Sequence, residues 1–239
     1  ALSDIAAMGG EPLHLLVNLV ASPDDRVERI ERVYAGLNRV CREHHVAVIG
    51  GDTACGAHLE LHIFLTGRVP AGTALRRSGA GPDEIIYVTG ALGGSIRGKH
   101  LEFRPRLAEG TWLREEKWAT AAIDLSDGLA TDLRHVLVAS GISAVLDETR
   151  IPISADVGTL QTRRTPVEHA LYDGEDFELL FTVPAACQRD FEAAWSRRFE
   201  LPCRAIGRTQ PGQPVIQMLN SHAQIVELPD GGFEHFRGV

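Results

Sequence analysis

Hydrophobic and polar residues alternate with two different periods along this chain of 239 residues. A nearly continuous apolar run over residues 13–20 predicts a strand, and alternating apolar positions over 59–66 predict a second, half-buried strand. Between them, apolar residues recur at helical spacing over 27–41, which predicts a helix with one buried face. Residues 22–25 (Ser-Pro-Asp-Asp) precede it. We interpret them as the helix start, with a cap, a proline and early acids.

The mixture of strand and helix patterns resumes after residues 67–81, which are rich in glycine, proline and arginine and are interpreted as a connection. The later predicted strands cover 85–89, 121–125, 144–147, 178–183 and 203–207, and the later helices follow Gly128 and Pro184. We place a domain boundary in the connection, with residues 1–75 in a first domain and 80–239 in a second. The pattern alone predicts only mixed layers of helix and sheet.

Composition and charge narrow the class of protein. Apolar residues make up 44% of the chain and charged residues 23%, which is typical of a globular protein. The formal net charge of -8 argues against a nucleic-acid surface, so an anionic substrate would need local arginines or bound magnesium. We find neither a membrane-length apolar run nor a signal-like start. Four scattered cysteines without a CxxC motif favour reduced thiols, and we expect a cytoplasmic protein that does not bind membranes.

Three segments combine carboxylates with glycine where strands are predicted to end. They are residues 50–53 (Gly-Gly-Asp-Thr), 124–128 (Asp-Leu-Ser-Asp-Gly) and 173–176 (Asp-Gly-Glu-Asp). Glycine lets a phosphate approach the backbone, and magnesium binds carboxylate oxygens at roughly 2.0 to 2.1 Å. The three segments therefore predict a magnesium and phosphate site. The alternative is that they only form turns, with Ser126 or Asp127 capping the following helix.

Two further patterns do not carry a function. Residues 93–99 (Gly-Gly-Ser-Ile-Arg-Gly-Lys) match a P-loop, but His100 stands where a hydroxyl would bind magnesium. We therefore reject a P-loop and keep a close turn. The histidines at 44, 45, 58 and 62 are interpreted as structural, because His62 lies in an alternating strand pattern. No Ser/His/Asp or Cys/His arrangement supports acyl transfer.

Six segments, taken in order and spacing, resemble the thiamine-monophosphate kinase family. They are residues 3–9 (SDIAAMG), 50–53 (GGDT), 77–80 (RSGA), 88–93 (VTGALG), 123–129 (IDLSDGL) and 174–182 (GEDFELLFT). Aminoimidazole ribonucleotide synthetase, selenophosphate synthetase and the hydrogenase maturation factor share this family's fold and ATP use. The resemblance implies an α+β, two-domain aminoimidazole ribonucleotide synthetase-like fold, with mixed β-sheets flanked by helices and an ATP- and magnesium-binding first domain.

The resemblance also implies an activity, the phosphorylation of thiamine monophosphate to thiamine diphosphate by direct in-line transfer from ATP with magnesium. Catalysis would rest on positioning and electrostatics, and no side chain is assigned a catalytic role. Carried over by position, the implied residues are Gly51, Asp52, Arg77 and Ser126 for ATP, Asp52, Asp124 and Asp127 for magnesium, and Glu175 and Phe233 for the substrate. Phe233 would stack on the substrate, and core packing is its alternative role.

The sequence departs from the family pattern in three ways, of which one is a turn variant, Asp83-Glu84 where the family usually has Gly-Asp. The family's first segment, which carries an acidic magnesium motif and a substrate-contacting histidine, would precede Ala1, so we expect this exact chain to be inactive. The family builds its nucleotide site across a dimer of first domains, and we expect a homodimer when that segment is present. Asp173 stands where a second glycine is usual.

Two alternative functions stay open: a related ATP-dependent enzyme with another acceptor, and a non-catalytic nucleotide-binding or dimerisation module.

Overall fold

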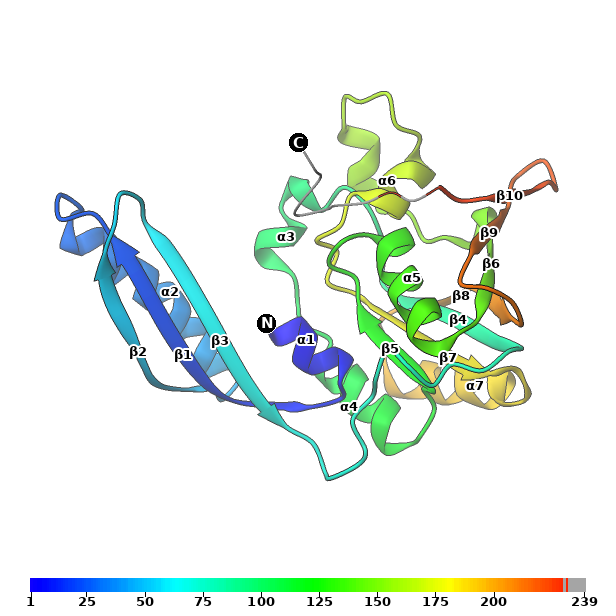
Figure 1. The fold of residues 1–239 in the computed structure, drawn as a ribbon, viewed down its shortest axis with the longest axis horizontal. Coiled ribbons are helices and arrows are strands. Elements are labelled where there is room, and N and C mark those ends of the chain that lie inside the picture. Colours follow the sequence, from blue (N-terminus) through cyan, green and yellow to red (C-terminus); the bar gives the residue numbers. More distant parts are fainter. Residues whose placement is uncertain (230, 232–239) are drawn as a thin grey trace.

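The computed structural model describes residues 1–229 and 231, which form two sheets of unequal size (Figure 1). The small sheet has the strand order β2-β1-β3, with β1 parallel to β2 and antiparallel to β3. It is built from β1 (Glu11–Ala21), α2 (Val27–Glu43), β2 (Ala47–Cys55) and β3 (Glu60–Arg68). The short helix α1 (Leu2–Ala7) precedes β1 and packs against the region that holds the large sheet.

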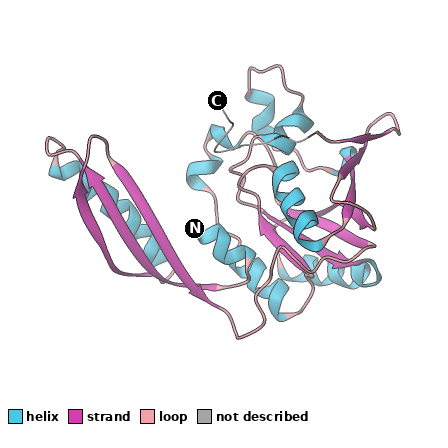
Figure 2. Cartoon of the chain, in the orientation of Figure 1, coloured by secondary structure: helices cyan, strands magenta, loops and turns pink. Residues whose placement is uncertain are grey.

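The large sheet has seven strands in the order β10-β9-β6-β8-β4-β7-β5, and every neighbouring pair is antiparallel except β6 and β9. The strands are β4 (Glu84–Thr89), β5 (Ala121–Asp124), β6 (Ser143–Asp147), β7 (Leu179–Pro184), β8 (Cys203–Gln210), β9 (Ile216–Leu219) and β10 (Ile225–Glu227). The helices are α3 (Lys99–Glu102), α4 (Leu107–Glu115), α5 (Leu129–Ser140), α6 (Pro166–Tyr172) and α7 (Gln188–Arg198), and the 3-10 turns are η1 (Ser95–Arg97), η2 (Glu148–Arg150), η3 (Ala155–Thr159) and η4 (Ala185–Cys187) (Figure 2).

Both faces of the large sheet are covered by helices. Alternate residues of β4 enter two different cores, with Ile86 on one face and Tyr87 on the other. The first core includes apolar residues of α5 and α6, and the second includes those of α1, α4 and α7. A strand whose two faces are both buried is apolar over most of its length, and all six residues of β4 are buried, with polar side chains only at its ends, Glu84 and Thr89.

The small sheet is much more exposed. Its core consists of Leu15 and Val17 of β1 packed against Cys41 of α2, whereas every residue of β2 is exposed. The strand predicted at 59–66 is present as β3, but its predicted half-burial is wrong, since Leu61 and Ile63 are 38% and 42% exposed. The reason is that the buried residue of α2 packs on β1 and leaves most of β3 outside the core.

Two predicted helix starts are also wrong. Helix α2 begins at Val27 with Arg26 as its N-cap, and residues 22–25 form a turn in which the Ser22 N–H donates to Asp25 Oδ2 over 3.1 Å. The Asp25 carboxylate therefore closes a turn before the helix. Pro184 ends β7, and α7 starts only at Gln188 after the 3-10 turn η4.

Two general properties of the described residues bear on the class of protein. Among residues 1–229 and 231, no helix is long and apolar enough to cross a membrane. All four cysteines are free thiols, and burial raises the pKa of the Cys203 thiol. Cys203 therefore has the character of a packed apolar residue rather than of a reactive thiolate.

Candidate functional site

Asp124 is the last residue of β5 and is only 5% exposed. Burial raises the pKa of its carboxyl, the Ser3 side chain opposes this by hydrogen bonding to it, and the charge of Asp4 raises it further. The two α1 residues that begin the first matching segment thus lie beside the segment 124–128, although about 120 positions separate them in the sequence. The structure therefore brings into contact two matching segments that lie far apart in the sequence.

The turn after Asp124 is held from inside by Asp132 of α5. The backbone N–H groups of Ser126 and Asp127 donate to Asp132 Oδ2 over 2.9 and 3.0 Å. Gly128 is the N-cap of α5 and has no side-chain cap, so the capping role considered for Ser126 or Asp127 is wrong. Gly128 also has a φ of 106°, and a Cβ there would lie 2.8 Å from Leu171 O. Only glycine fits such a turn without strain.

Asp132 is a site residue that the sequence reasoning missed. It is 1% exposed, and burial raises the pKa of its carboxyl to about 7, with the charges of Asp127 and Asp124 acting in the same direction and the two N–H donors opposing them. Ligand atoms of Asp127, Asp132 and His135 all lie within 4.8 Å of one another. The signal available in the sequence was an acid in the first turn of a strongly apolar helix.

Backbone hydrogen bonds join the segment 124–128 to the segment 174–178, and we call the pair the joined loops. Glu175 N donates to Ser126 O, Phe177 N to Leu125 O, and Leu125 N to Glu178 O, each over 2.8 Å. A Cβ on Gly174 would lie 2.7 Å from Ser126 O, so the contact between the two segments requires glycine there. The structure therefore brings together the predicted residues Asp124, Ser126, Asp127 and Glu175.

Glu175 is the exposed member of the joined loops. Its φ of 55° lies in the left-handed region, as does that of Phe177 at 52°. Left-handed backbone at residues other than glycine persists only where the surroundings impose it, and it concentrates at functional sites. Here the backbone hydrogen bonds from Glu175 to Ser126 and from Phe177 to Leu125 hold both residues in the left-handed conformation.

Two buried carboxylates anchor the second of the joined loops. Asp176 accepts hydrogen bonds from Gly93 N at 3.1 and 2.9 Å, and Glu178 forms a paired contact with Arg106 at 2.7 Å for each bond. Lys99 Nζ lies 3.0 Å from Glu178 and 3.7 Å from Asp176. Burial raises the pKa of Asp176 to about 6, whereas Arg106 and Lys99 overcome the burial of Glu178 and lower the pKa of that carboxyl.

The same contacts explain the P-loop-like segment 93–99. Its lysine, Lys99, is bound to the two carboxylates and also donates to Ala91 O over 2.7 Å. The N–H groups of Gly93 and Gly94 are used by Asp176 and Asp173. A P-loop needs these donors for phosphate, so the rejection of a P-loop is confirmed.

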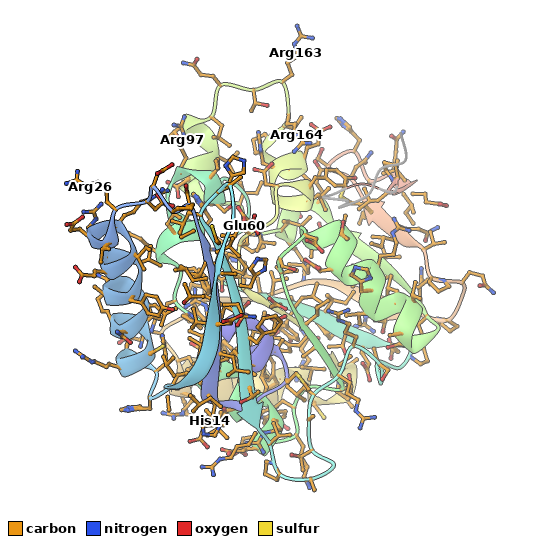
Figure 3. The ribbon with its side chains drawn as sticks, turned by 60° about the vertical axis from the view of Figure 1, so that its left-hand side comes forward. His14, Arg26, Glu60, Arg97, Arg163 and Arg164 are labelled. Carbon is orange, nitrogen blue, oxygen red and sulfur yellow. The ribbon has the colours of Figure 1, made fainter. Side chains whose placement is uncertain are left out.

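Asp173, the departure from the family pattern, closes α6 with an ordinary φ of -71°. Its carboxylate accepts from Gly94 N and contacts His169 Nδ1 at 2.7 Å and Arg164 at 3.0 Å. Figure 3 shows Arg163 and Arg164 on the loop that leads into α6. Asp173 is thus part of the support of the loop, and its backbone conformation does not require the glycine that is usual there.

Gly51 and Asp52 lie inside β2, so the prediction that a strand ends before Gly50–Thr53 is wrong. Gly51 continues the strand with a φ of 150°, and a Cβ there would fall 1.8 Å from Val17 O. Asp52 pairs across the sheet with Asn18, and its carboxylate accepts only from the adjacent Thr53 N among the hydrogen bonds of the described residues. It is exposed, and Figure 1 shows β2 as the outer strand of the small sheet, away from β5.

Arg77, like Gly51 and Asp52, is a predicted residue that lies away from the joined loops. Arg77 is exposed in the connection between the sheets, and its carbonyl accepts from Ser140 Oγ at the far end of α5 from Ser126. Twelve helical residues separate the two ends by about 18 Å. Phe233 lies outside the described residues. Gly231, the last residue that the structure describes, accepts a hydrogen bond through its carbonyl from the Thr131 hydroxyl of α5 over 2.6 Å.

The arrangement agrees with similarities to known proteins. Residues 1–69 match the family described as AIR synthase related protein, N-terminal domain. The thiamine-monophosphate kinase of Escherichia coli K12 is 37% identical over 256 residues, an alignment that covers 98% of this chain and 77% of that enzyme. The chain belongs to the thiamine-monophosphate kinase family. The predicted family and the predicted α+β fold class are therefore confirmed.

Two further similarities come from the same family. The thiamine-monophosphate kinase of Rhodopirellula baltica is 40% identical over 185 residues, covering 76% of this chain and 58% of that enzyme. The solved structure of AaThiL complexed with AMPPCP and TMP has a TM-score of 0.83 and 26% identity, and it covers 98% of this chain and 77% of that one. The chain thus spans between about three fifths and three quarters of the lengths of these family members.

Proposed function

We propose that this chain is the greater part of an enzyme that phosphorylates thiamine monophosphate to thiamine diphosphate with ATP and magnesium. Membership of the family supports the reaction, and the AaThiL complex shows that protein holding AMPPCP and TMP together. The observation that carries the proposal is the backbone pairing of Ser126 with Glu175. It places residues implied for ATP and magnesium next to the residue implied for the acceptor.

The chemistry of the joined loops fits a magnesium site. The N–H groups of Ser126 and Asp127 point at Asp132, which leaves carboxylate and hydroxyl oxygens as the groups that Asp124, Ser126 and Asp127 can offer. Hard cations bind such oxygens. Magnesium would neutralise the charge that develops on the transferred phosphoryl group, with Asp124 and Asp127 holding it.

The remaining residues orient the two substrates in the proposed reaction. An oxygen of the acceptor phosphate attacks the γ-phosphorus of ATP in line, the bond to the bridging oxygen breaks, and ADP leaves. Gly51, Asp52 and Arg77 bind the nucleotide from the first domain and the connection, and Asp52 adds a metal ligand. Glu175 and Phe233 bind the thiamine side. Catalysis then comes from positioning and charge stabilisation, without a catalytic base.

Three further parts of the proposal concern the whole protein. The first domain, residues 1–75, would bind ATP and magnesium, and residues 80–239 would form the second domain. Exposed apolar side chains on the small sheet, including Leu16 and Phe64, support a homodimer through that sheet. The free cysteines are in keeping with a reducing compartment, and we place the reaction in the cytoplasm.

The test is thiamine diphosphate formation from thiamine monophosphate, ATP and magnesium. We would compare this chain with a version that carries, ahead of Ala1, the residues preceding the aligned region of the E. coli enzyme. Activity is expected in the extended version. Asp124→Asn should lower it by at least about 100-fold, because loss of even an outer-shell partner of a metal costs up to that much.

The matched control is Asp147→Asn, because Asp147 also ends a strand of the large sheet and its carboxylate caps the local turn at Thr149 N over 3.0 Å. It should keep full activity. Turnover with a different acceptor, and none with thiamine monophosphate, would replace the substrate in this proposal. Nucleotide binding without turnover of any acceptor would favour a non-catalytic module.

A further inference from the structure

Asp132 is a buried acid that has no role in the function proposed above. It lies in the first turn of α5, is 1% exposed, and receives two backbone N–H groups on a single carboxylate oxygen. Burying a carboxylate is costly unless it is hydrogen-bonded, and among residues 1–229 and 231 Asp132 obtains those bonds from Ser126 and Asp127. Its burial and the conformation of the turn therefore depend on each other.

The direction of these bonds decides which ions the turn can bind. Loops that precede a helix commonly turn several N–H groups outward, and such groups bind phosphate and other anions. In this chain the N–H groups of Ser126 and Asp127 turn inward to Asp132 instead. At Ser126 and Asp127 the turn consequently offers oxygens rather than N–H donors, which suits a cation better than a bare phosphate.

The position of Asp132 also adds negative charge beneath the turn. Its ligand atom lies within 4.8 Å of those of Asp127 and His135, and carboxylates that close repel one another when both are charged. A divalent cation bound by Asp124 and Asp127 would relieve this repulsion. Removing the charge of Asp132 should therefore weaken binding of the cation, even if the turn keeps its shape.

We propose that Asp132 is a positioning residue that makes the turn at Ser126 and Asp127 a magnesium site, by accepting the N–H groups of both residues. This inference rests on the proposed function for its metal and its nucleotide. It goes beyond that function because it gives a new role to Asp132, a residue proposed to contact neither substrate. That role is to make the turn select a cation over a phosphate.

The experiment measures how magnesium affects binding of AMPPCP to the extended protein, by calorimetry at increasing magnesium concentration, with turnover measured in parallel. Asp132→Ala removes both hydrogen bonds and the charge, and it should raise the magnesium concentration at half saturation by roughly 10- to 100-fold. Asp132→Asn keeps one oxygen acceptor for the two N–H groups. It should give a smaller rise and should recover most of the turnover at high magnesium.

Asp147→Asn is the control, since it removes a carboxylate that also accepts a backbone N–H but lies at another strand end. Its half-saturating magnesium concentration should match that of the unsubstituted protein. Should Asp132→Ala fail to fold, Asp132→Asn decides the outcome alone.

Two results would overturn the inference. Unchanged half-saturating magnesium in Asp132→Asn, with only a lower melting temperature, would show that Asp132 acts on stability alone. No magnesium-dependent binding by the unsubstituted extended protein would refute the proposed function, and the inference with it. The first result leaves the proposed function standing, so the two failures can be told apart.

Discussion

The candidate residues around the large sheet and those of the small sheet differ in burial and in hydrogen-bond partners. In the large sheet, Asp124, Asp132 and Asp176 are at most 5% exposed and have defined partners. In the small sheet, Asp52 is exposed on a strand whose every residue is exposed, and its carboxylate accepts from the adjacent Thr53 N. The first group is held in place before any ligand binds. Asp52 is positioned only by its strand.

The difference follows from how each sheet is covered. Helices pack on both faces of the large sheet, so polar groups there must find partners inside the protein. Helix α2 packs on one face of the small sheet and leaves the other to solvent, where water can satisfy a carboxylate. Part of the candidate site is therefore preorganised and part is not. Four variants test this contrast.

The largest effect is expected from Glu178→Ala in the large sheet. It removes the partner of Arg106 and Lys99 and leaves two cations beside a buried site, which should lower the free energy of unfolding by about 3 to 5 kcal/mol. Urea denaturation measures the loss. Glu60→Ala is the control, because Glu60 pairs with His62 on the exposed β3, and it should cost under about 0.5 kcal/mol. Similar losses for both variants would contradict the contrast.

Gly51→Ala should destabilise the small sheet alone, by about 3 kcal/mol, because its Cβ would overlap Val17 O across the strand pair. Hydrogen exchange should show lost protection in β1 and β2, with unchanged protection in β4 and β7. The control is Gly36→Ala, which meets nothing within 4 Å on helix α2 and should stabilise the chain by about 0.5 to 1 kcal/mol. Lost protection in both sheets would mean that they unfold as one unit.

Asp176→Asn should change how stability depends on pH. The pKa of Asp176 is raised to about 6 from 3.8, so the folded chain holds this proton more tightly than the unfolded chain does. As the pH rises from 4 to 7, the unsubstituted chain should therefore lose about 2 kcal/mol of stability relative to Asp176→Asn. Thermal unfolding at several pH values measures the difference. A constant difference would show that Lys99 and Gly93 fully compensate the buried charge.

The smallest effect is expected from Asp52→Asn, which should change the free energy of unfolding by less than about 0.5 kcal/mol, since the side chain is exposed. It should nevertheless reduce turnover of the extended protein, because Asp52 is proposed to bind magnesium. A stability loss above about 1 kcal/mol would indicate that Asp52 has a structural role that its exposure does not suggest.

Apolar periodicity predicted the elements that have a strong pattern of their own. The strands predicted at 85–89 and 121–125 correspond to β4 and β5, and the helix predicted after Gly128 corresponds to α5. Strands β9 and β10 went unpredicted, because they are short and lie near the edge of the sheet, where few apolar residues are needed. The wrong start of α2 has a local cause, since the Asp25 carboxylate closes a turn instead of capping a helix.

Motifs identified the joined loops, but the sequence could not show what supports them. The contacts of Asp176 with Gly93 and of Glu178 with Arg106 link residues that lie more than 70 positions apart. Only the tertiary fold brings such residues together. The strand through Gly50 and Gly51 was predicted as a loop, because glycine usually ends strands, and here it serves close approach to β1.

The backbone bonds between Ser126 and Glu175 and between Leu125 and Phe177 also remove a degree of freedom from the reaction. Because the residues proposed to hold the metal and the acceptor lie on the joined loops, these bonds set their separation when the chain folds. A rotation about the two connections of the small sheet, residues 8–10 and 69–83, would move Asp52 relative to both by a single displacement. The alignment of the two substrates would then depend on one angle, the angle between the small sheet and the joined loops.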